Sequence, residues 1–325
     1  MNKLFSAIAA ATLIAGFGSV SAQVTHRPLV EEYTGTWCGY CPRGTIAMEL
    51  LQEKYGDDIV IACFHVDDVM QVDTYPNGVN ITGLPRATVD RGSSVDPYYG
   101  KSNTEDMAII DEVENAKIKL ANADIVVTEA TCDGDNVIVK TETTFILDQN
   151  NQGYRVGYLL ISDNVSGLGI NWAQSNYYSG ASGLQGTPLE ELAGKKSYIS
   201  GFIYNDVVID SKGCNGVPGS LPTNVVAGEK YTHQYIFDIR KNKLAKKESL
   251  RVVAYILKSN KIINSNKLDV AYSNAGIDTL PSGAELVETI YYTLDGRVVS
   301  EPSKGIYIKT QRYSDGTTKT TKITR

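Results

Sequence analysis

The sequence predicts an α/β domain at the N-terminal end, an all-β sandwich in the middle and a short β domain at the C-terminal end. Strand, helix and strand patterns follow one another at residues 27–33, 45–55 and 58–66, an order typical of a βαβ unit with parallel strands. After residue 124 the apolar residues recur with a period of two in short segments separated by turn residues, which indicates a sandwich. Within that region, residues 163–194 are rich in Gly, Ser, Asn and Tyr and are expected to form a long loop.

The most informative motif lies between the first strand and the helix, where residues 37–42 read Trp-Cys-Gly-Tyr-Cys-Pro. Two cysteines at this spacing close a small disulfide ring, and the amides and dipole of a helix start favour the leading sulfur as a thiolate. The pattern predicts Cys38 as the nucleophile of thiol–disulfide exchange and Cys41 as the resolving thiol. Half of a zinc site has the same spacing, but the other cysteines and histidines are scattered singly and supply no second pair of ligands.

A second segment, Ile-Thr-Gly-Leu-Pro-Arg at residues 81–86, precedes another short strand. Together with the Cys-x-x-Cys motif it resembles the thioredoxin superfamily, whose members place a cis-proline opposite the two cysteines across the active-site cleft. The resemblance implies a thioredoxin-like fold with Pro85 in the catalytic site, and an ordinary trans-proline in a loop is the alternative. We assign the contacts with a substrate peptide to the neighbouring residues Trp37, Tyr40, Leu84 and Arg86.

The same resemblance assigns a catalytic role to an acid in the first strand. Glu32 stands six residues before Cys38, the spacing at which thioredoxin keeps a buried acid that relays protons to its second cysteine. Because neighbouring residues of a strand point to opposite faces, at most one of Glu31 and Glu32 is expected to be that acid, and Glu32 is the candidate. Two solvated carboxylates at a sheet edge are the alternative. The dipeptide between the cysteines is Gly-Tyr where thioredoxin has Gly-Pro, which leaves the direction of the redox reaction open.

Three further cysteines stand alone in the sequence. Cys63 lies in the apolar second strand and is expected to be a small buried hydrophobe. Cys132 and Cys214 both fall in predicted turns, and in an exported protein they can form a structural disulfide that leaves Cys63 as the odd thiol. That pairing requires Cα atoms within about 7 Å of each other, which the spacing in the sequence does not show.

Residues 1–22 are typical of a secretory signal peptide, with Lys3 followed by an apolar stretch and by small residues before position 23. We expect the mature chain to begin at Gln23 and to have no transmembrane span, because no later stretch approaches about 18 apolar residues. Export predicts the outer membrane, the cell surface or the medium, reached through the periplasm. The formal net charge is −6, and a mildly acidic chain is a poor nucleic-acid binder, so nucleic acid is not an expected partner.

The last residues have a separate character, with short alternating strands and Gly turns over 276–325. Within 283–325 an Asp-Gly-Arg-Val turn, a Gly-Ile-Tyr-Ile strand and a basic terminal strand follow in order. This order resembles the C-terminal sorting domain of the type IX secretion system, and the resemblance implies that machinery as a partner. One more hairpin of the preceding domain is the alternative.

Taken together, the signal peptide, the Cys-x-x-Cys segment and the β-rich region resemble the outer-membrane-protein-28-like family over about residues 24–270. That family joins a thioredoxin-like module to a β-sandwich on exported proteins of Gram-negative bacteria. The predicted fold is therefore an α/β thioredoxin-like domain, an all-β sandwich and a short C-terminal β sorting domain. The expected boundaries are 1–22 for the signal peptide, 23–105 for the thioredoxin-like domain, 106–123 for a connecting helix, 124–275 for the sandwich and 276–325 for the sorting-type domain.

The leading functional hypothesis is an exported thiol–disulfide oxidoreductase that acts on protein or peptide thiols and disulfides without a cofactor. The sequence contains no phosphate loop and no dinucleotide fingerprint. His65 with Asp67 or Asp68 suggests a metal site only weakly, because no fourth ligand is in evidence. The alternative is a surface binding or adhesion protein in which the Cys38–Cys41 bond is only a structural disulfide.

Overall fold

The computed structural model describes residues 24–79, 83–99, 107–245, 249–272, 286–293, 297–300, 302–303, 305–314 and 318–324. Strands predominate in these ranges, which contain three α-helices: α1 at Pro42–Tyr55, α2 at Ile109–Lys117 and α3 at Glu190–Ala193. Two single-turn 3₁₀ helices, η1 at Gly56–Asp58 and η2 at Ile170–Trp172, also lie in the described chain. The predicted signal peptide lies outside the described residues.

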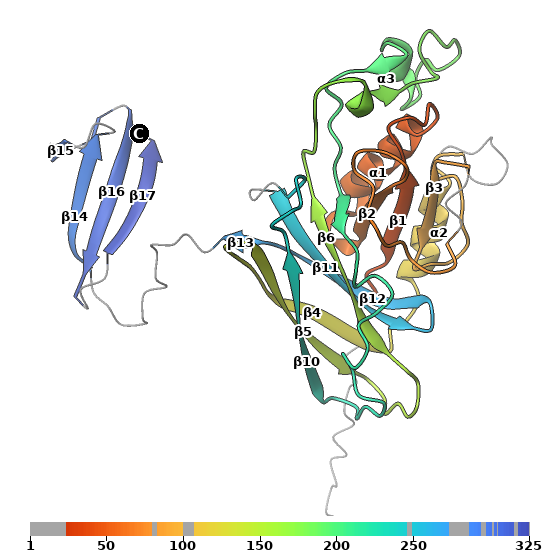
Figure 1. Ribbon diagram of the computed structural model, residues 1–325. Coiled ribbons are helices and arrows are strands. Elements are labelled where there is room, and N and C mark those ends of the chain that lie inside the picture. The colour runs from red at the N-terminus through yellow and green to blue at the C-terminus, as the bar shows by residue number, and fades with distance from the viewer. Residues whose placement is uncertain are drawn as a thin grey trace, which may run out of the picture.

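A seven-stranded sheet forms the centre of the molecule, in the order β12-β11-β6-β9-β2-β1-β3 (Figure 1). Its strands are β1 (Leu29–Thr34), β2 (Val60–His65), β3 (Arg86–Val89), β6 (Arg155–Ser162), β9 (Val207–Asp210), β11 (Leu250–Lys258) and β12 (Lys261–Asp269). β1 pairs in parallel with β2 and antiparallel with β3. On its other edge β2 pairs with β9, and β9 in turn pairs with β6.

The expected α/β thioredoxin-like domain is contradicted by this architecture. The β1–α1–β2 unit is present, but it is one end of a sheet that takes strands from both halves of the chain. The described chain as a whole is mostly β, with several sheets and only the three α-helices named above. Local periodicity detected the βαβ unit correctly, but it carries no information about which distant strands join the free edge of that unit.

α1 begins at Pro42, where a missing backbone N–H costs little because the first amides of a helix have no partner within the helix. Its apolar residues, among them Ala47 and Leu51, are buried against the β1 and β2 residues Val30 and Ile61. The buried face of α2 joins the same cluster. The helices therefore cover one face of the β1 end of the sheet and fix the position of the loop between β1 and α1.

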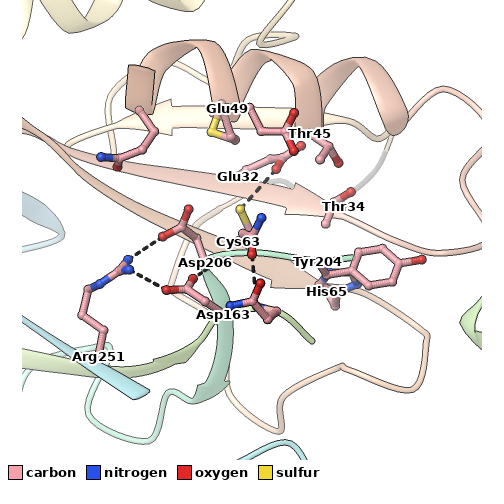
Figure 2. A pocket seen from close by; sticks show the side chains of 14 residues that line it. Glu32, Thr34, Thr45, Glu49, Cys63, His65, Asp163, Tyr204, Asp206 and Arg251 are labelled. Carbon is pink, nitrogen blue, oxygen red and sulfur yellow. Dashed lines mark hydrogen bonds and ion pairs between the residues drawn. The ribbon is translucent and has the colours of Figure 1, made fainter. Parts of the chain in front are cut away.

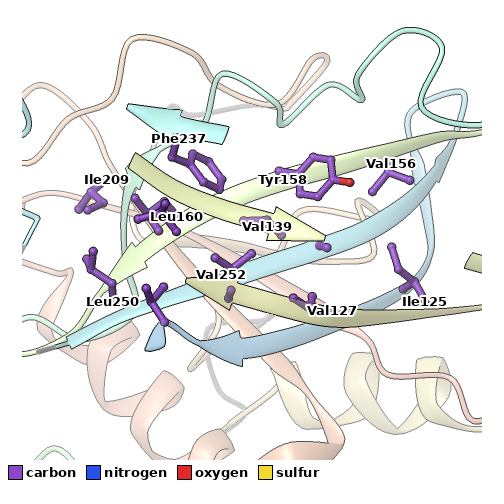
Figure 3. Close-up of a cluster of buried hydrophobic side chains, with 14 of the residues drawn as sticks. Ile125, Val127, Val139, Val156, Tyr158, Leu160, Ile209, Phe237, Leu250 and Val252 are labelled. Carbon is purple, nitrogen blue, oxygen red and sulfur yellow. The ribbon is translucent and has the colours of Figure 1, made fainter. Parts of the chain in front are cut away.

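A second, four-stranded sheet packs on the opposite end of the central sheet, in the order β10-β5-β4-β13. Its strands are β4 (Ala123–Asp133), β5 (Asn136–Phe145), β10 (Lys230–Asp238) and β13 (Ala271–Tyr272). Strand β6 points Tyr158 and Leu160 into the core between the sheets, whereas Leu159 and Ile161 belong to a different cluster on its other face (Figure 3). Burial of both faces explains why β6 is apolar along most of its length.

The described chain also contains two smaller sheets. Strands β7 (Gln174–Ser175) and β8 (Tyr198–Ile199) pair with each other. β7 lies inside the region expected to be a long loop, and β8 follows just after it. Strands β14 (Leu286–Thr293), β15 (Val298–Val299), β16 (Ile306–Tyr313) and β17 (Thr318–Thr324) form a sheet of their own near the C-terminal end. The domain boundaries expected from the sequence stay a prediction.

Among the described residues, no helix combines the length and the apolar character that a membrane crossing requires.

Candidate functional site

The Cys38–Cys41 disulfide lies in the loop that joins β1 to α1. The two Cα atoms are 5.3 Å apart, and the backbone amide of Cys41 donates to the carbonyl of Cys38 at 3.1 Å. Cys41 directly precedes α1, and its carbonyl accepts from the amide of Gly44 at 2.8 Å. The disulfide predicted at the helix start is therefore confirmed, and its chemistry depends on what surrounds it.

Residues 170–199, here called the cover segment, lie against this loop. Four hydrogen bonds attach them: from Ser175 N–H to Thr36 O at 2.7 Å, from Tyr177 N–H to Gly39 O at 2.9 Å, and from Gln174 Nε2 to Cys38 O at 3.0 Å and to Gly35 O at 3.4 Å. The backbone carbonyls of the loop are thus already occupied by the chain's own donors. This contact is not predicted from the sequence, where its one local signal is the tyrosine content of the expected loop.

The cover segment leaves the disulfide almost without solvent contact. Cys38 is 5% exposed and Cys41 is fully buried. A Cβ atom at Gly39 would lie 2.3 Å from the Tyr177 ring, a distance that no real contact tolerates, so only glycine allows the ring to approach this closely. The glycine inside the Cys-x-x-Cys motif therefore serves the packing of the cover segment.

Around the covered disulfide, four aromatic side chains remain exposed, and we call them the aromatic rim. They are Trp37, Tyr40, Tyr177 and Tyr198, with exposed fractions of 53%, 50%, 66% and 57%. Trp37 Nε1 donates to the carbonyl of Val66 at 2.8 Å, and the rings of Tyr40 and Tyr177 meet edge to face with centroids 5.0 Å apart. Trp37 and Tyr198 line one shallow surface groove, and Tyr177 and Tyr198 line another. The four rings are therefore neighbours through one ring contact and two shared grooves.

Arg43, in the first turn of α1, supports the rim from below. Its guanidinium pairs with Asp96, donates to the Tyr178 hydroxyl at 2.9 Å and lies 5.1 Å from the Tyr40 ring centroid. These partners fix the guanidinium between the rim and the helix start. The arrangement holds Tyr40 in place by a cation–π contact.

The segment before β3 approaches the helix start as the resemblance implies. The Leu84–Pro85 peptide bond is cis, and Pro85 Cβ would lie 2.9 Å from a Cβ at Gly44. Leu84 packs on the cluster formed at the other face of the sheet, and Arg86 opens β3. The structure therefore brings Pro85 to the first turn of α1 but places Leu84 on the other face of the sheet. The catalytic role of Pro85 and the substrate-binding roles of Leu84 and Arg86 stay predictions.

Glu31 and Glu32 are both buried, at 0% and 1% exposure, which excludes two solvated edge carboxylates. Glu31 pairs with buried Arg91 at 2.9 Å. Glu32 faces α1. Its Oε2 accepts from the Cys63 thiol at 3.3 Å, and its Oε1 has no hydrogen-bond partner among the described residues (Figure 2). Burial raises the pKa of Glu32 to about 8. The sequence predicted Glu32 as the buried acid, but it gave no sign of the second buried acid or of its arginine.

The predicted Cys132–Cys214 disulfide is not formed. Cys132 belongs to the core between the two large sheets, and its Sγ lies 3.6 Å from the Gly134 carbonyl. Cys214 is fully buried in the cluster on the other face of the central sheet. The two residues do fall in or next to turns, but those turns are attached to different cores.

His65, the last residue of β2, forms a close pair with Asp68, with Nδ1 and Oδ2 2.7 Å apart. Asp68 also accepts from the amides of Thr36 and Met70. These contacts give His65 and Asp68 a role in fixing the loop ends. Within the part of the chain that the structure describes, no group of three or more His, Cys, Asp or Glu side chains is placed to hold a metal ion.

No family model matches this chain, and no curated protein matches it. Among solved structures, the fold is similar to that of HBP35 of Porphyromonas gingivalis, with 16% identity, a TM-score of 0.54 and coverage of 93% of this chain and 98% of that chain. A protein of Agrobacterium tumefaciens matches at 14% identity and a TM-score of 0.42, over 80% of this chain and 100% of that chain. The first likeness shows a shared fold along nearly the whole length, and the second is too weak to carry an argument.

Proposed function

We propose that this chain is an exported binding protein that contacts a protein or peptide partner through the aromatic rim, with Cys38–Cys41 as a structural disulfide. The observation that carries the proposal is that the disulfide is covered whereas the aromatic side chains around it are exposed. The signal peptide and the sorting-type C-terminal region expected from the sequence support an outer-membrane, surface or secreted location.

Thiol–disulfide exchange requires a thiolate to reach a disulfide sulfur in line with the bond. Cys38, the sulfur that would meet a partner, is 5% exposed behind the cover segment. The carbonyls of Cys38 and Gly39, which lie next to that sulfur, accept hydrogen bonds from Gln174 and Tyr177. The closed arrangement favours a disulfide that holds the loop rather than one that turns over.

The rim has the composition of a protein-binding surface. Interfaces are enriched in Trp, Tyr and Arg, and the residues that contribute most to affinity are aromatic side chains held rigidly before binding. Trp37 is fixed by its hydrogen bond to Val66, and Tyr40 by its contacts with Tyr177 and Arg43. Fixed side chains lose little conformational entropy when a partner binds, which favours affinity.

The two functional hypotheses differ in what the disulfide does when a thiol is offered. We expect the Cys38–Cys41 bond of the mature protein to stay oxidised in a glutathione buffer, and a Cys41→Ser variant to trap no partner. A structural disulfide has a potential below about −300 mV. Reduction by glutathione at a higher potential, together with mixed disulfides through Cys38, would refute the structural role and favour an oxidoreductase.

The binding role is tested on the rim itself, by selecting peptides from a random library on the immobilised mature protein. We expect the selected peptides to lose at least tenfold in affinity for a Trp37→Ala variant, the loss typical of a central aromatic contact. Val126→Ala is the matched control, because Val126 is an exposed apolar residue of β4, outside the rim. Equal binding by the two variants would contradict the assignment of the rim.

A further inference from the structure

A cavity of about 360 Å³ lies between α1, the strands β1 and β2, and the residues directly before β9 (Figure 2). Residues of α1 form one side of its wall, and Glu32 of β1 forms another. Asp163, Asp206 and Arg251, from the β-rich half of the chain, complete the charged part of the wall. None of the aromatic-rim residues lines it, so the cavity is a separate site. Its volume accommodates a ligand of a few non-hydrogen atoms with surrounding water.

The wall of the cavity carries more carboxyl groups than cations. Glu32, Glu49, Asp163 and Asp206 line it, and Arg251 is the one arginine or lysine among the lining residues. The Arg251 guanidinium is already shared, with Nη1 2.7 Å from Asp206 and Nη2 2.5 Å from Asp163. Within the described residues Glu32 and Glu49 have no ion-pair partner, so an anion is an unsuitable occupant.

Glu32 supplies the second observation. The side chain is 1% exposed, and its Oε1 has no hydrogen-bond partner among the described residues. A buried carboxyl oxygen without a donor costs free energy, unless a ligand or water supplies the hydrogen bond. The acids around it also raise its pKa, since Asp206 and Glu49 act on it electrostatically in addition to burial, so a cation in the cavity would relieve this repulsion.

We propose that this cavity binds a small organic cation whose ammonium or guanidinium group donates hydrogen bonds to Glu32, with Glu49 at the exposed mouth adding attraction. Met48 and Tyr204 in the same wall provide apolar surface for the carbon chain of such a ligand. A divalent metal ion fits less well, because no group of three or more suitable ligands converges within the part of the chain described here.

The test is calorimetric titration of the full mature protein with n-butylammonium, and with butan-1-ol and butyrate as a neutral and an anionic probe of the same length. The titration is run at about pH 8, near the pKa of Glu32. We expect saturable binding of the ammonium probe with a dissociation constant of about 1 mM, and at least tenfold weaker binding of the other two.

Three variants locate the bound cation. Glu32→Gln keeps the side-chain shape and removes the charge, and we expect about a tenfold loss of ammonium affinity. Glu49→Gln should lower the affinity for the ammonium probe only a few-fold, because Glu49 is exposed and solvent screens its charge. Glu53→Gln, an exposed residue of the same helix that lines no part of the cavity, should bind as the natural protein does. Equal affinity for butan-1-ol, unchanged affinity in Glu32→Gln, or no saturable heat would overturn the proposal.

Discussion

Replacing Glu32 with glutamine should stabilise the fold in a pH-dependent way. The pKa of Glu32 is about 8 in the folded chain, against 4.5 for an ordinary glutamate, and burial is the largest cause. In the unfolded chain the side chain is solvated, so it ionises near the ordinary value. Between these two pH values the folded state holds a proton that the unfolded state has released, and the free energy of unfolding therefore falls as pH rises.

The size of the effect follows from the two ionisation constants. A tenfold change in such a constant corresponds to about 1.4 kcal/mol, so ionised Glu32 destabilises the fold by at most about 5 kcal/mol above pH 8. Below about pH 4.5 both states are protonated and the penalty disappears. Glutamine never ionises, so the Glu32→Gln variant should match the natural protein in acid and exceed it progressively toward alkaline pH.

The assay is urea unfolding of both proteins at about pH 5, 7 and 9, with the difference in unfolding free energy plotted against pH. Other titrating groups, such as Asp206, are present in both proteins, so their contributions to the unfolding free energy cancel to first order in this difference. Glu53→Gln, on the exposed side of α1, is the control and should show a difference near zero throughout. A Glu32→Gln difference that does not change with pH would refute the assignment of a raised pKa to Glu32.

Three further predictions concern the cover segment, the buried ion pair and the C-terminal region. Gly39→Ala places a Cβ atom 2.3 Å from the Tyr177 ring, so it should displace that ring and speed reduction of the disulfide by dithiothreitol several-fold. Gly194→Ala is the control and should leave the reduction rate unchanged, because its Cβ would meet nothing closer than 3.7 Å. Equal reduction rates in the two variants would contradict the covering role of the segment. Arg91→Met leaves buried Glu31 without its ion-pair partner and should lower the free energy of unfolding by about 3–5 kcal/mol. A loss below about 1 kcal/mol, measured by urea unfolding, would contradict a stabilising role of this ion pair. Deletion of 283–325 should leave the protein folded but retained in the periplasm, as measured by surface labelling, and unchanged surface delivery would remove the sorting proposal.

The sequence predicted those features that depend on neighbouring residues. The first strand was expected at 27–33 and lies at Leu29–Thr34, and the helix expected at 45–55 lies at Pro42–Tyr55. Both follow from apolar periodicity and from a proline at a helix start. The disulfide also follows from local spacing, because two cysteines three positions apart at a helix start are already close to each other.

The overall architecture depends on distant pairings that periodicity does not encode. β2 meets β9 through Cys63 and Val207, a contact between segments that have no common pattern. The cover segment reaches the disulfide by single hydrogen bonds, such as the one from Gln174 to Cys38. For this reason the sequence predicted an exposed nucleophile, and the structure contains a covered disulfide surrounded by exposed rings.

Glu31 and Glu32 show how the fold distinguishes a structural acid from a candidate site. Both carboxyl groups are buried on neighbouring positions of β1. On one face Arg91 donates to both oxygens of Glu31, so that charge is compensated within the chain. On the other face Glu32 receives only the weak thiol donor of Cys63, and one oxygen remains without a partner among the described residues.

An acid left in this state lowers stability, and local penalties of this kind are concentrated at functional sites. The fold demonstrably can compensate a buried acid of β1, since it does so for Glu31 with Arg91. We therefore propose that the missing donor at Glu32 comes from outside the chain, through the cavity that Glu32 lines. If Glu32→Gln raises stability at alkaline pH and also weakens binding of n-butylammonium, the same carboxyl group accounts for both effects.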